Sequence, residues 1–542
     1  MMKGRSLFTA VTRALFLMLG LSFAVLILPA QLRAQVTSGS ISGTAVDPSG
    51  AVVPGVEVRV INTGTGSVAT ATTDNAGLFR FSELLVGTYT LEFTKQSFSK
   101  YVVDNVVVSS GTDQGVGLVK LALGASTVTV EVTEAPPLIE TTEAQVSTTF
   151  TTQQITSFAG LQENEGLDFL ALQIPGVNMT RDSTFSNTNG VGFSVDGLRG
   201  RNNDQQIDGQ NNNDNSVAGP SLFVTNPDFV QEYQVTTNNF GAEYGRNSGS
   251  VVNMVTPSGT NNWHGTINGA EGNSVLDSLT NVDKEPLLTP GLTKVPWFNY
   301  VFASTTVGGP VRKDHIFVFG GFDTNIIEEN SVDQSGSLTP TPVGLAQLAA
   351  CYPNSASVAA LRTFGPYGIG AGNPTPNGTV TPIQLTGSNL GPCSVDFAGV
   401  TRTLGSPFHQ YDFIGRSDFQ YSNDRVYLRY LYNYSNNINA DPFGTAAAGY
   451  PVSVPSRSQT GLIGWTHTLS PSMTNEFRLS YGRQNTEFGG NGIGNTVPVQ
   501  GNIGNALASV GVSPTDGSPI LGFGPSQMCI RDRAGPTRYR RP

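Results

Sequence analysis

The residues of this chain best suited to chemistry are four histidines and several acidic loops, and neither group forms a catalytic pattern. A zinc hydrolase needs His and carboxylate ligands gathered around one metal ion. His264, His315, His409 and His467 are widely separated, and none begins an HxxE or HExxH pattern. The sequence therefore argues against a secreted hydrolase, and it gives no sign of a cofactor.

Calcium binding is the second chemistry that the sequence raises. Asp204, Asp208 and Asp214 lie in an asparagine-rich loop, but their spacing does not match an EF-hand and no glutamate closes the loop. The sequences VDG at 195–197 and IDG at 207–209 are more simply turn signals. We therefore expect no metal site in this loop.

Cys351 and Cys393 form an even pair within one long polar segment, once Cys529 near the end of the chain is set aside. In an exported protein such a pair favours a disulfide that staples the loop. Two free thiols are the alternative, because the sequence does not show whether the geometry permits a bond.

Both ends of the chain differ from the rest. Residues 1–34 carry three basic residues before an apolar run from Ala14 to Leu28, which predicts a secretory signal peptide, with an uncleaved anchor as the alternative. Residues 527–542 begin QMCIRDR, which resembles a translated sequencing adapter. We expect this tail to be a sequencing artefact that cuts the natural sequence short near Ser526; a genuine basic tail is the alternative.

Composition narrows the class of protein. Charged residues make up only 13% of the 542 residues, and 63 glycines favour a structure of strands and turns. Removing the six charged residues of the tail and the four basic residues of the leader takes the formal charge from −10 to −18. No cationic surface then remains to support nucleic-acid binding. No segment after the leader suits a spanning helix, so a membrane role would need strands.

The pattern of residues 39–123 predicts short strands joined by glycine turns. Val56, Val58 and Val60 alternate with Glu57 and Arg59, which gives one buried face and one wet face. The segments ISGTAVDPSGAVVPGVEVRV and TTDNAGLFRFSELLVGTYTLEF resemble a carboxypeptidase regulatory-like domain, which is a transthyretin-like β-sandwich. That family name implies no peptidase activity.

Residues 155–258 contain three further motifs in the order of a known family. LQENEGLDFLALQIPGV, GFSVDGLRGRNNDQQIDGQNNND and DFVQEYQVTTNNFGAEYGRNSGSVVNMVTPSGT resemble the α+β plug domain of TonB-dependent outer-membrane receptors, especially those with the sandwich in front. The resemblance covers residues 39–325. It implies that polar contacts hold a plug in a barrel; our gating candidates are Asp196, Arg199, Arg201, Asp208, Glu243, Tyr244 and Arg246. Ordinary structural loop chemistry is the alternative for each.

Between the two domains, residues 124–154 are expected to form a linker, which two prolines interrupt. The resemblance implies that an alternating segment there can be the box grasped by the TonB energy-coupling complex. The candidate residues are Thr127, Val128, Thr129, Val130, Glu131 and Val132. A final strand of the sandwich is an equally good interpretation.

After residue 259 the pattern changes to strands of about ten residues with two different faces. Val426, Leu428 and Tyr430 fall on one face, which suits lipid, while Arg425 and Arg429 fall on the other, which suits water. The expected strands lie near 260–270, 298–309, 315–323, 411–421, 425–434, 459–468 and 474–483. Short turns and long loops alternate between them, as in outer-membrane barrels. A soluble sandwich, whose strands alternate equally well, is the alternative.

Seven strands cannot close around a plug, since plugged outer-membrane transporters use about 22. We therefore expect residues 259–526 to be the N-terminal part of a barrel. The predicted fold is mostly β: a transthyretin-like sandwich, then an α+β plug domain, then an incomplete antiparallel transmembrane barrel.

These features predict an outer-membrane receptor for TonB-coupled uptake of a large or scarce ligand, with its N-terminal domain in the periplasm. Its expected partners are the TonB complex, outer-membrane lipid and an extracellular ligand of unknown class. Iron chelates, cobalamin, glycans and peptides all remain open as ligands. A surface adhesion or scaffold protein that binds without transport is the alternative, and energy dependence would separate the two.

Overall fold

The computed structural model describes three folded units and a distal extension. The described residues are 38–124, 129–132, 145–158, 166–179, 193–214, 219–241, 244–245, 247–279, 281, 284, 294–295, 297–353, 358, 375–385, 392–405, 407–439, 452–470, 473–486, 509–512 and 519–522. The expected signal peptide (1–34) and the expected artefact (527–542) lie outside them.

The N-terminal unit is a sandwich of two sheets, with strand orders β4-β1-β7 and β3-β2-β5-β6-β8. Val58, Leu91 and Phe93 are fully buried in the core between the sheets, as the alternation around Val58 predicts. The strands are β1 (Gly39–Val46), β2 (Glu57–Asn62), β3 (Val68–Thr72), β4 (Leu78–Leu84), β5 (Gly87–Thr94), β6 (Lys100–Val108), β7 (Asp113–Lys120) and β8 (Thr129–Val132).

Strand β8 contains four of the six residues expected as a TonB box. It pairs in parallel with β6 and is the end strand of its sheet. Thr127 and Val128 lie outside the described residues. In the structure this segment is therefore a final strand of the sandwich, and its outer edge pairs with no other strand in the described part of the chain.

The middle domain is built on a mixed five-stranded sheet with the order β13-β12-β15-β14-β9. It begins before residue 155, the boundary expected from the sequence, because β9 of the expected linker pairs with β14. Phe193, Phe229 and Tyr233 are fully buried in its core. Its elements are β9 (Val146–Thr151), α2 (Thr152–Phe158), η1 (Gly166–Gln173), β10 (Val177–Met179), β11 (Phe193–Val195), η2 (Gly200–Asn202), β12 (Asp204–Ile207), β13 (Gln210–Asn211), η3 (Pro227–Phe229), β14 (Glu232–Asn238) and β15 (Val251–Val255).

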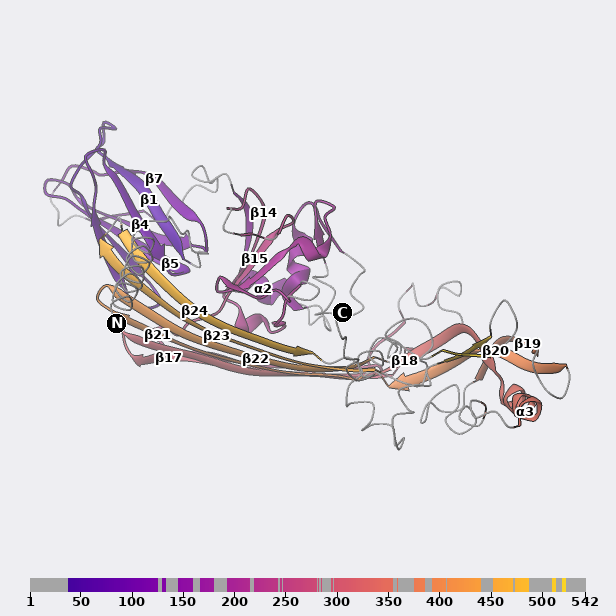
Figure 1. Ribbon diagram of the computed structural model, residues 1–542. Coiled ribbons are helices and arrows are strands. Elements are labelled where there is room, and N and C mark those ends of the chain that lie inside the picture. The colour runs from indigo at the N-terminus through magenta and orange to yellow at the C-terminus, as the bar shows by residue number, and fades with distance from the viewer. Residues whose placement is uncertain are drawn as a thin grey trace, which may run out of the picture.

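The third unit is a long antiparallel sheet with the order β16-β17-β18-β21-β22-β23-β24, whose two end strands do not pair with each other. Its strands overlap the seven that the sequence predicts, and most of them are longer than predicted. In Figure 1 the sandwich lies at one end of this sheet and the middle domain lies against one of its faces. The strands are β16 (His264–Asn273), β17 (Phe298–Arg312), β18 (Ile316–Pro340), β21 (Phe408–Tyr421), β22 (Asp424–Asn439), β23 (Val452–Ser470) and β24 (Met473–Thr486). Two short strands, β25 (Ser509–Val512) and β26 (Pro519–Gly522), pair separately.

The long sheet carries apolar side chains outside and polar ones inside, the reverse of a soluble protein. On the outer face Leu428 and Leu479 are 41% and 59% exposed. On the face toward the middle domain, Asp323, Arg429 and Asn433 are at most 4% exposed. The outer face therefore suits hydrocarbon, as the alternation predicts, and the inner face needs a polar filling. No helix in the described part of the chain is long and apolar enough to cross a membrane.

The connection from β18 to β21, expected to be one long loop, contains a folded distal unit at the other end of the sheet from the sandwich (Figure 1). Leu348, Val395 and Phe397 are buried in a small core there. A disulfide joins Cys351 to Cys393, with Cα atoms 5.9 Å apart. The unit consists of the end of β18, α3 (Pro342–Cys351), β19 (Thr375–Leu385) and β20 (Cys393–Gly405), which pairs with β18 and β19.

We expect the disulfide to hold the distal unit together. Its cysteines are 42 residues apart, and closing a loop of that size stabilises the folded state by about 4 kcal/mol in the loop-entropy description. The Cys351→Ser/Cys393→Ser variant should keep the long sheet but lose protease resistance within residues 342–405, while Cys529→Ser should change neither. Alkylation without reductant, followed by peptide mapping, should leave both cysteines unmodified; two alkylated cysteines would contradict the structure.

Candidate functional site

The candidate site is the contact between the middle domain and the inner face of the long sheet, and four buried charges form its centre. Arg416 of β21 lies directly opposite Arg429 of β22. Asp208 of the middle domain bridges them: its Oδ1 is 3.7 Å from Arg416 Nη1, and its Oδ2 is 3.3 Å from Arg429 Nη1. Asp418 accepts a hydrogen bond from Arg416 Nη2 at 2.9 Å. The two positive and two negative charges therefore balance.

The middle domain supplies the negative charge and the hydrogen-bond acceptors that Arg429 needs. Like charges directly opposite each other destabilise a sheet, and a buried unpaired charge costs several kcal/mol. Besides the Asp208 contact, Arg429 donates hydrogen bonds to Ile207 O at 3.3 Å and to Gln210 Oε1. These acceptors all belong to the middle domain, so Arg429 is paired only when that domain is in place.

A turn and one threonine hold the Asp208 carboxylate in position. Asp208 follows β12 with a φ of 49°, and Gly209 follows with a φ of 67°, a left-handed conformation that aspartate tolerates and glycine adopts readily. Thr256 donates from its N–H to Oδ1 and from its Oγ1 to Oδ2, both at 2.8 Å. The IDG turn signal in the sequence therefore also presents the charge to the sheet.

Residues 221–228, here called the crossing segment, make a second contact with the sheet. The segment reaches β23, β22, β21 and β16, so it spans most of the width of the sheet. Ser221 O accepts from Ser458 Oγ, Phe223 O from Asn433 Nδ2 at 3.4 Å, Thr225 Oγ1 from Gln410 Nε2 at 3.0 Å, and Asp228 Oδ2 from Thr266 Oγ1 at 2.8 Å. Water can replace the partner in each of these polar contacts.

The sandwich docks on the middle domain through Ser110, which is fully buried. Its N–H donates to Glu232 Oε1 at 3.0 Å, its carbonyl accepts from Gln234 Nε2 at 2.8 Å, and its hydroxyl accepts from Asn253 Nδ2 at 3.1 Å. Burial raises the pKa of Glu232 to about 7, and the hydrogen bond from Ser110 opposes this rise. The docking contact therefore contains a carboxyl group that titrates near neutral pH.

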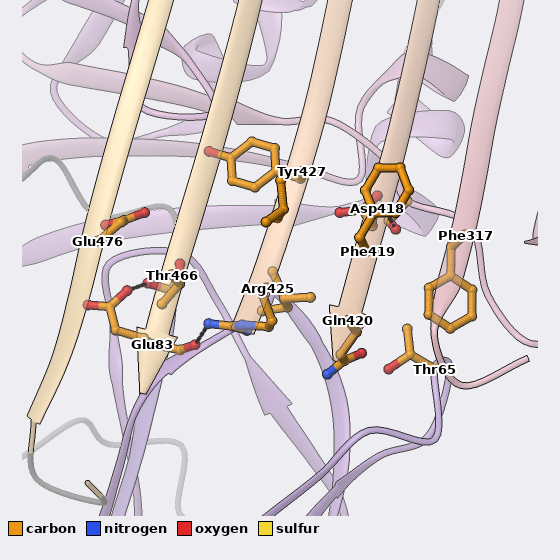
Figure 2. Close-up of a pocket in the computed structure, with 14 residues that line it drawn as sticks. Thr65, Glu83, Phe317, Asp418, Phe419, Gln420, Arg425, Tyr427, Thr466 and Glu476 are labelled. Carbon is orange, nitrogen blue, oxygen red and sulfur yellow. Dashed lines mark hydrogen bonds between the residues drawn. The ribbon is translucent and has the colours of Figure 1, made fainter. Parts of the chain in front are cut away.

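A small cavity of about 30 Å³ lies where the sandwich meets the ends of the sheet strands (Figure 2). Glu83 of the sandwich accepts a hydrogen bond from Arg425 of β22 through its carbonyl oxygen, and Asp418 and Glu476 also line the space. A cavity of this size holds water rather than a ligand. We therefore regard it as part of the junction between domains.

The structure places the gating candidates in different surroundings. Asp208 lies at the centre of the contact with the sheet, whereas Asp196, Arg199 and Arg201 are exposed. Tyr244 is half-buried, and Glu243 and Arg246 lie outside the described residues. In the part of the chain that the structure describes, no three His, Cys, Asp or Glu residues group to hold a metal ion.

The alternation in the sequence places Arg429 on the polar face, but neither Arg429 nor Arg416 was named there as a site residue. The signal that could have identified them is that both side chains point inward from neighbouring strands. An arginine on the inner face of a filled barrel needs an acceptor. The acidic turn at Asp208, one of the gating candidates, is a motif that could supply one.

The family of outer membrane beta barrel domains matches residues 255–539, just over half of the chain. The chain belongs to the outer membrane beta-barrel family. A carboxypeptidase regulatory-like domain matches residues 40–122, which confirms the resemblance of the sandwich. The long sheet is therefore the wall of an outer-membrane barrel, and the protein belongs in the outer membrane.

The TonB-dependent transporter Oar of Myxococcus xanthus is a homologue, 27% identical over 297 residues that cover 53% of this chain and 26% of the transporter. The chain thus matches about a quarter of that relative's length. Among solved structures, the ferric enterobactin receptor of Pseudomonas aeruginosa is 12% identical over 63% of this chain and 45% of its own, with a TM-score of 0.33. The transporter YddB of Escherichia coli is also 12% identical, over 63% and 48%, with a TM-score of 0.34.

Removing the charge of Asp208 should weaken the attachment of the middle domain to the barrel wall. Asp208→Asn leaves Arg429 buried without an anion, and we expect a loss of about 3 kcal/mol or more in the free energy of unfolding. Asp196→Asn, at an exposed turn in the same domain, should change it by less than about 0.5 kcal/mol. Denaturant titration of the detergent-solubilised protein measures both; equal midpoints for the two variants would contradict the assignment.

The docking of the sandwich should weaken as the pH rises. The pKa of Glu232 is raised to about 7 in the folded protein from an ordinary value of 4.5, so the folded contact favours the protonated form. The protonated Glu232 carboxyl group therefore stabilises the docking contact fully below about pH 4.5, and this stabilisation is lost as the pH rises through 7. Glu232→Gln should remove this dependence.

Spin-label distances between the sandwich and the middle domain at pH 5.5 and 8 measure the effect. Asp168 also has a pKa raised to about 7 by burial, but it lies within the middle domain, where its titration leaves this distance unchanged. Identical distance distributions for the unmodified protein at the two pH values would contradict the prediction.

Proposed function

We propose that this chain belongs to an outer-membrane receptor for TonB-coupled active uptake of a large or scarce ligand into the periplasm. The observation that carries the proposal is the charged contact of Asp208 with Arg416 and Arg429. A plug must be held at rest and yet leave under force. Polar contacts suit this task, because water can take the place of each lost partner once the plug is displaced.

In this proposal the middle domain is the plug. The outer loops and the outer side of the plug capture the ligand, and the TonB complex pulls on the periplasmic side to displace the plug from the wall. The named activity of the Myxococcus xanthus homologue supports coupling to TonB. The ligand class remains open among iron chelates, cobalamin, glycans and peptides.

The position of the sandwich supports a periplasmic location. It lies at the end of the barrel that carries the short turns, where Asn261 Nδ2 bonds Thr65 O of the sandwich at 2.8 Å and Asp314 of the β17–β18 turn at 2.7 Å. Outer-membrane barrels have short turns on the periplasmic side. The distal unit then lies outside the cell, where a disulfide can persist.

The distal unit also favours a second candidate function. A stapled unit with its own core, held away from the plug, suits binding to an extracellular surface without transport. In this alternative role of adhesion or scaffolding, the plug would remain in place permanently.

Locking the plug to the wall separates the two functions. Thr266 Oγ1 and Asp228 Oδ2 are 2.8 Å apart, so a short bis-methanethiosulfonate reagent should join the two thiols of Asp228→Cys/Thr266→Cys across the crossing segment and β16. Treated cells with this variant should take up ligand only after reduction, because the cross-linked plug cannot leave. The probes are a ferric siderophore, cobalamin, a malto-oligosaccharide and a short peptide.

The single variant Thr266→Cys is the control and should transport with or without reductant. Loss of TonB should also abolish uptake by the unmodified receptor. Uptake that continues with the plug locked, or without TonB, would contradict the proposed function.

A further inference from the structure

The inner face of the barrel carries a second pair of like charges on neighbouring strands. Asp323 of β18 lies directly opposite Asp412 of β21, and the two side chains are 0% and 4% exposed. Like charges in this arrangement repel each other. The arginine pair solves the same problem with Asp208 of the plug. Among the described residues, no arginine, lysine or histidine plays the corresponding part for the acidic pair.

The two carboxylates differ in their hydrogen bonds. Asp412 accepts from Gln410 Nε2 at 2.6 Å and from Asn433 Nδ2. Both oxygens of Asp323 are buried, and among the described residues neither has a hydrogen-bond partner of normal geometry; the Asn226 side chain interacts with this carboxyl group only more loosely. A buried carboxyl group in this position is stabilised either by a proton or by a positive partner of another kind.

Two further buried polar atoms belong to neighbours of Asp323 in the sheet. Ser304 of β17 lies directly opposite it, and Asn325 lies two residues along β18 on the same face, so both side chains point to the same side of the sheet. Both residues are about 5% exposed, and Ser304 Oγ and Asn325 Oδ1 have no hydrogen-bond partner in the part of the chain that the structure describes. With the two oxygens of Asp323, four buried oxygens gather here.

We propose that Asp323, Asp412, Ser304 and Asn325 form a calcium site between the barrel wall and the crossing segment of the plug. Hard divalent cations prefer carboxylate, hydroxyl and amide oxygens, and two carboxylates balance a charge of two. Calcium fits this site better than magnesium because the two ions differ in how readily they lose their water ligands. The site is closed to water, and magnesium gives up its water ligands reluctantly, whereas calcium accepts six to eight oxygens in flexible geometry.

The position of the site links the cation to the plug. Asn226 of the crossing segment lies beside the Asp323 carboxyl group, and its own Oδ1 accepts from Asp228 N at 3.0 Å. An ion at Asp323 therefore lies at the point where the crossing segment passes over β18 and β21. Bound calcium holds the wall and the plug together, and its loss leaves two repelling carboxylates beneath the segment.

This site is different from the acidic loop that the sequence suggested. In that loop Asp208 pairs with Arg416 and Arg429, and Asp204 accepts from Gln206 Nε2 at 2.7 Å. The calcium site does not depend on transport or on TonB, so its test leaves the proposed function untouched.

Calcium titration of the chelator-treated protein in detergent tests the proposal by calorimetry and by the melting temperature. The unmodified protein should bind about one calcium ion and melt at a higher temperature with calcium than without. Asp323→Asn should weaken binding at least tenfold. Glu328→Gln, on the same strand but with a half-exposed carboxylate paired to His409, should bind as the unmodified protein does.

Ser304→Ala/Asn325→Ala keeps both carboxylates and should also weaken calcium binding, which guards against a variant that merely fails to fold. Calcium that changes neither the heat nor the melting temperature of the unmodified protein would overturn the proposal. Equal affinities of Asp323→Asn and Glu328→Gln would overturn it too. A higher melting temperature for Asp323→Asn, with no response of the unmodified protein to calcium, would show that the carboxyl carries a proton instead.

Discussion

Arg416 and Arg429 face each other across two neighbouring strands, and Arg429 finds its acceptors in a different domain. The barrel wall therefore cannot satisfy its own inner face. Asp208 places a carboxylate between the two guanidinium groups, with a geometry fixed by the turn after β12 and by Thr256. Because of this one arrangement, the wall and the middle domain form a single electrostatic unit.

The outer face imposes the opposite requirement. Its leucines and aromatic side chains are exposed, so this face is stable only against hydrocarbon, while the inner face is stable only against a polar filling. These two demands fix the order of layers from lipid to wall to middle domain. The sandwich and the distal unit lie at the two ends of the strands, outside this layered region (Figure 1).

Strand positions and the direction of their side chains could be predicted because a period of two residues is a local property of the sequence. The alternation around Leu428 and Arg429 is visible in ten residues, and so is that of Val56, Val58 and Val60. The sandwich and the plug motifs were predicted from resemblance. All of these depend on neighbours in the sequence.

Contacts between distant residues could not be predicted in the same way. Asp208 was a gating candidate, but its partners Arg416 and Arg429 are about 200 residues away. No sequence pattern around the two arginines identifies Asp208 as their partner. The pairing of β9 with β14 moved the start of the middle domain, because a short Thr-rich strand looks like a linker until its partner is known. The distal unit was hidden by its polar composition, since its core consists of a few apolar residues gathered from α3, β19 and β20.

The feature on which this account rests most is the orientation of the barrel wall, whose apolar face lies in lipid and whose polar face points inward. Nitroxide labels at Leu428, Ile463 and Leu479, three exposed residues of neighbouring strands, test it most directly in liposomes, with a label at Ser422 in a short turn as the reference. Power saturation should show strong relaxation by oxygen and weak relaxation by a water-soluble nickel chelate at the three strand positions. Relaxation by the chelate as strong as that at Ser422 would contradict the account.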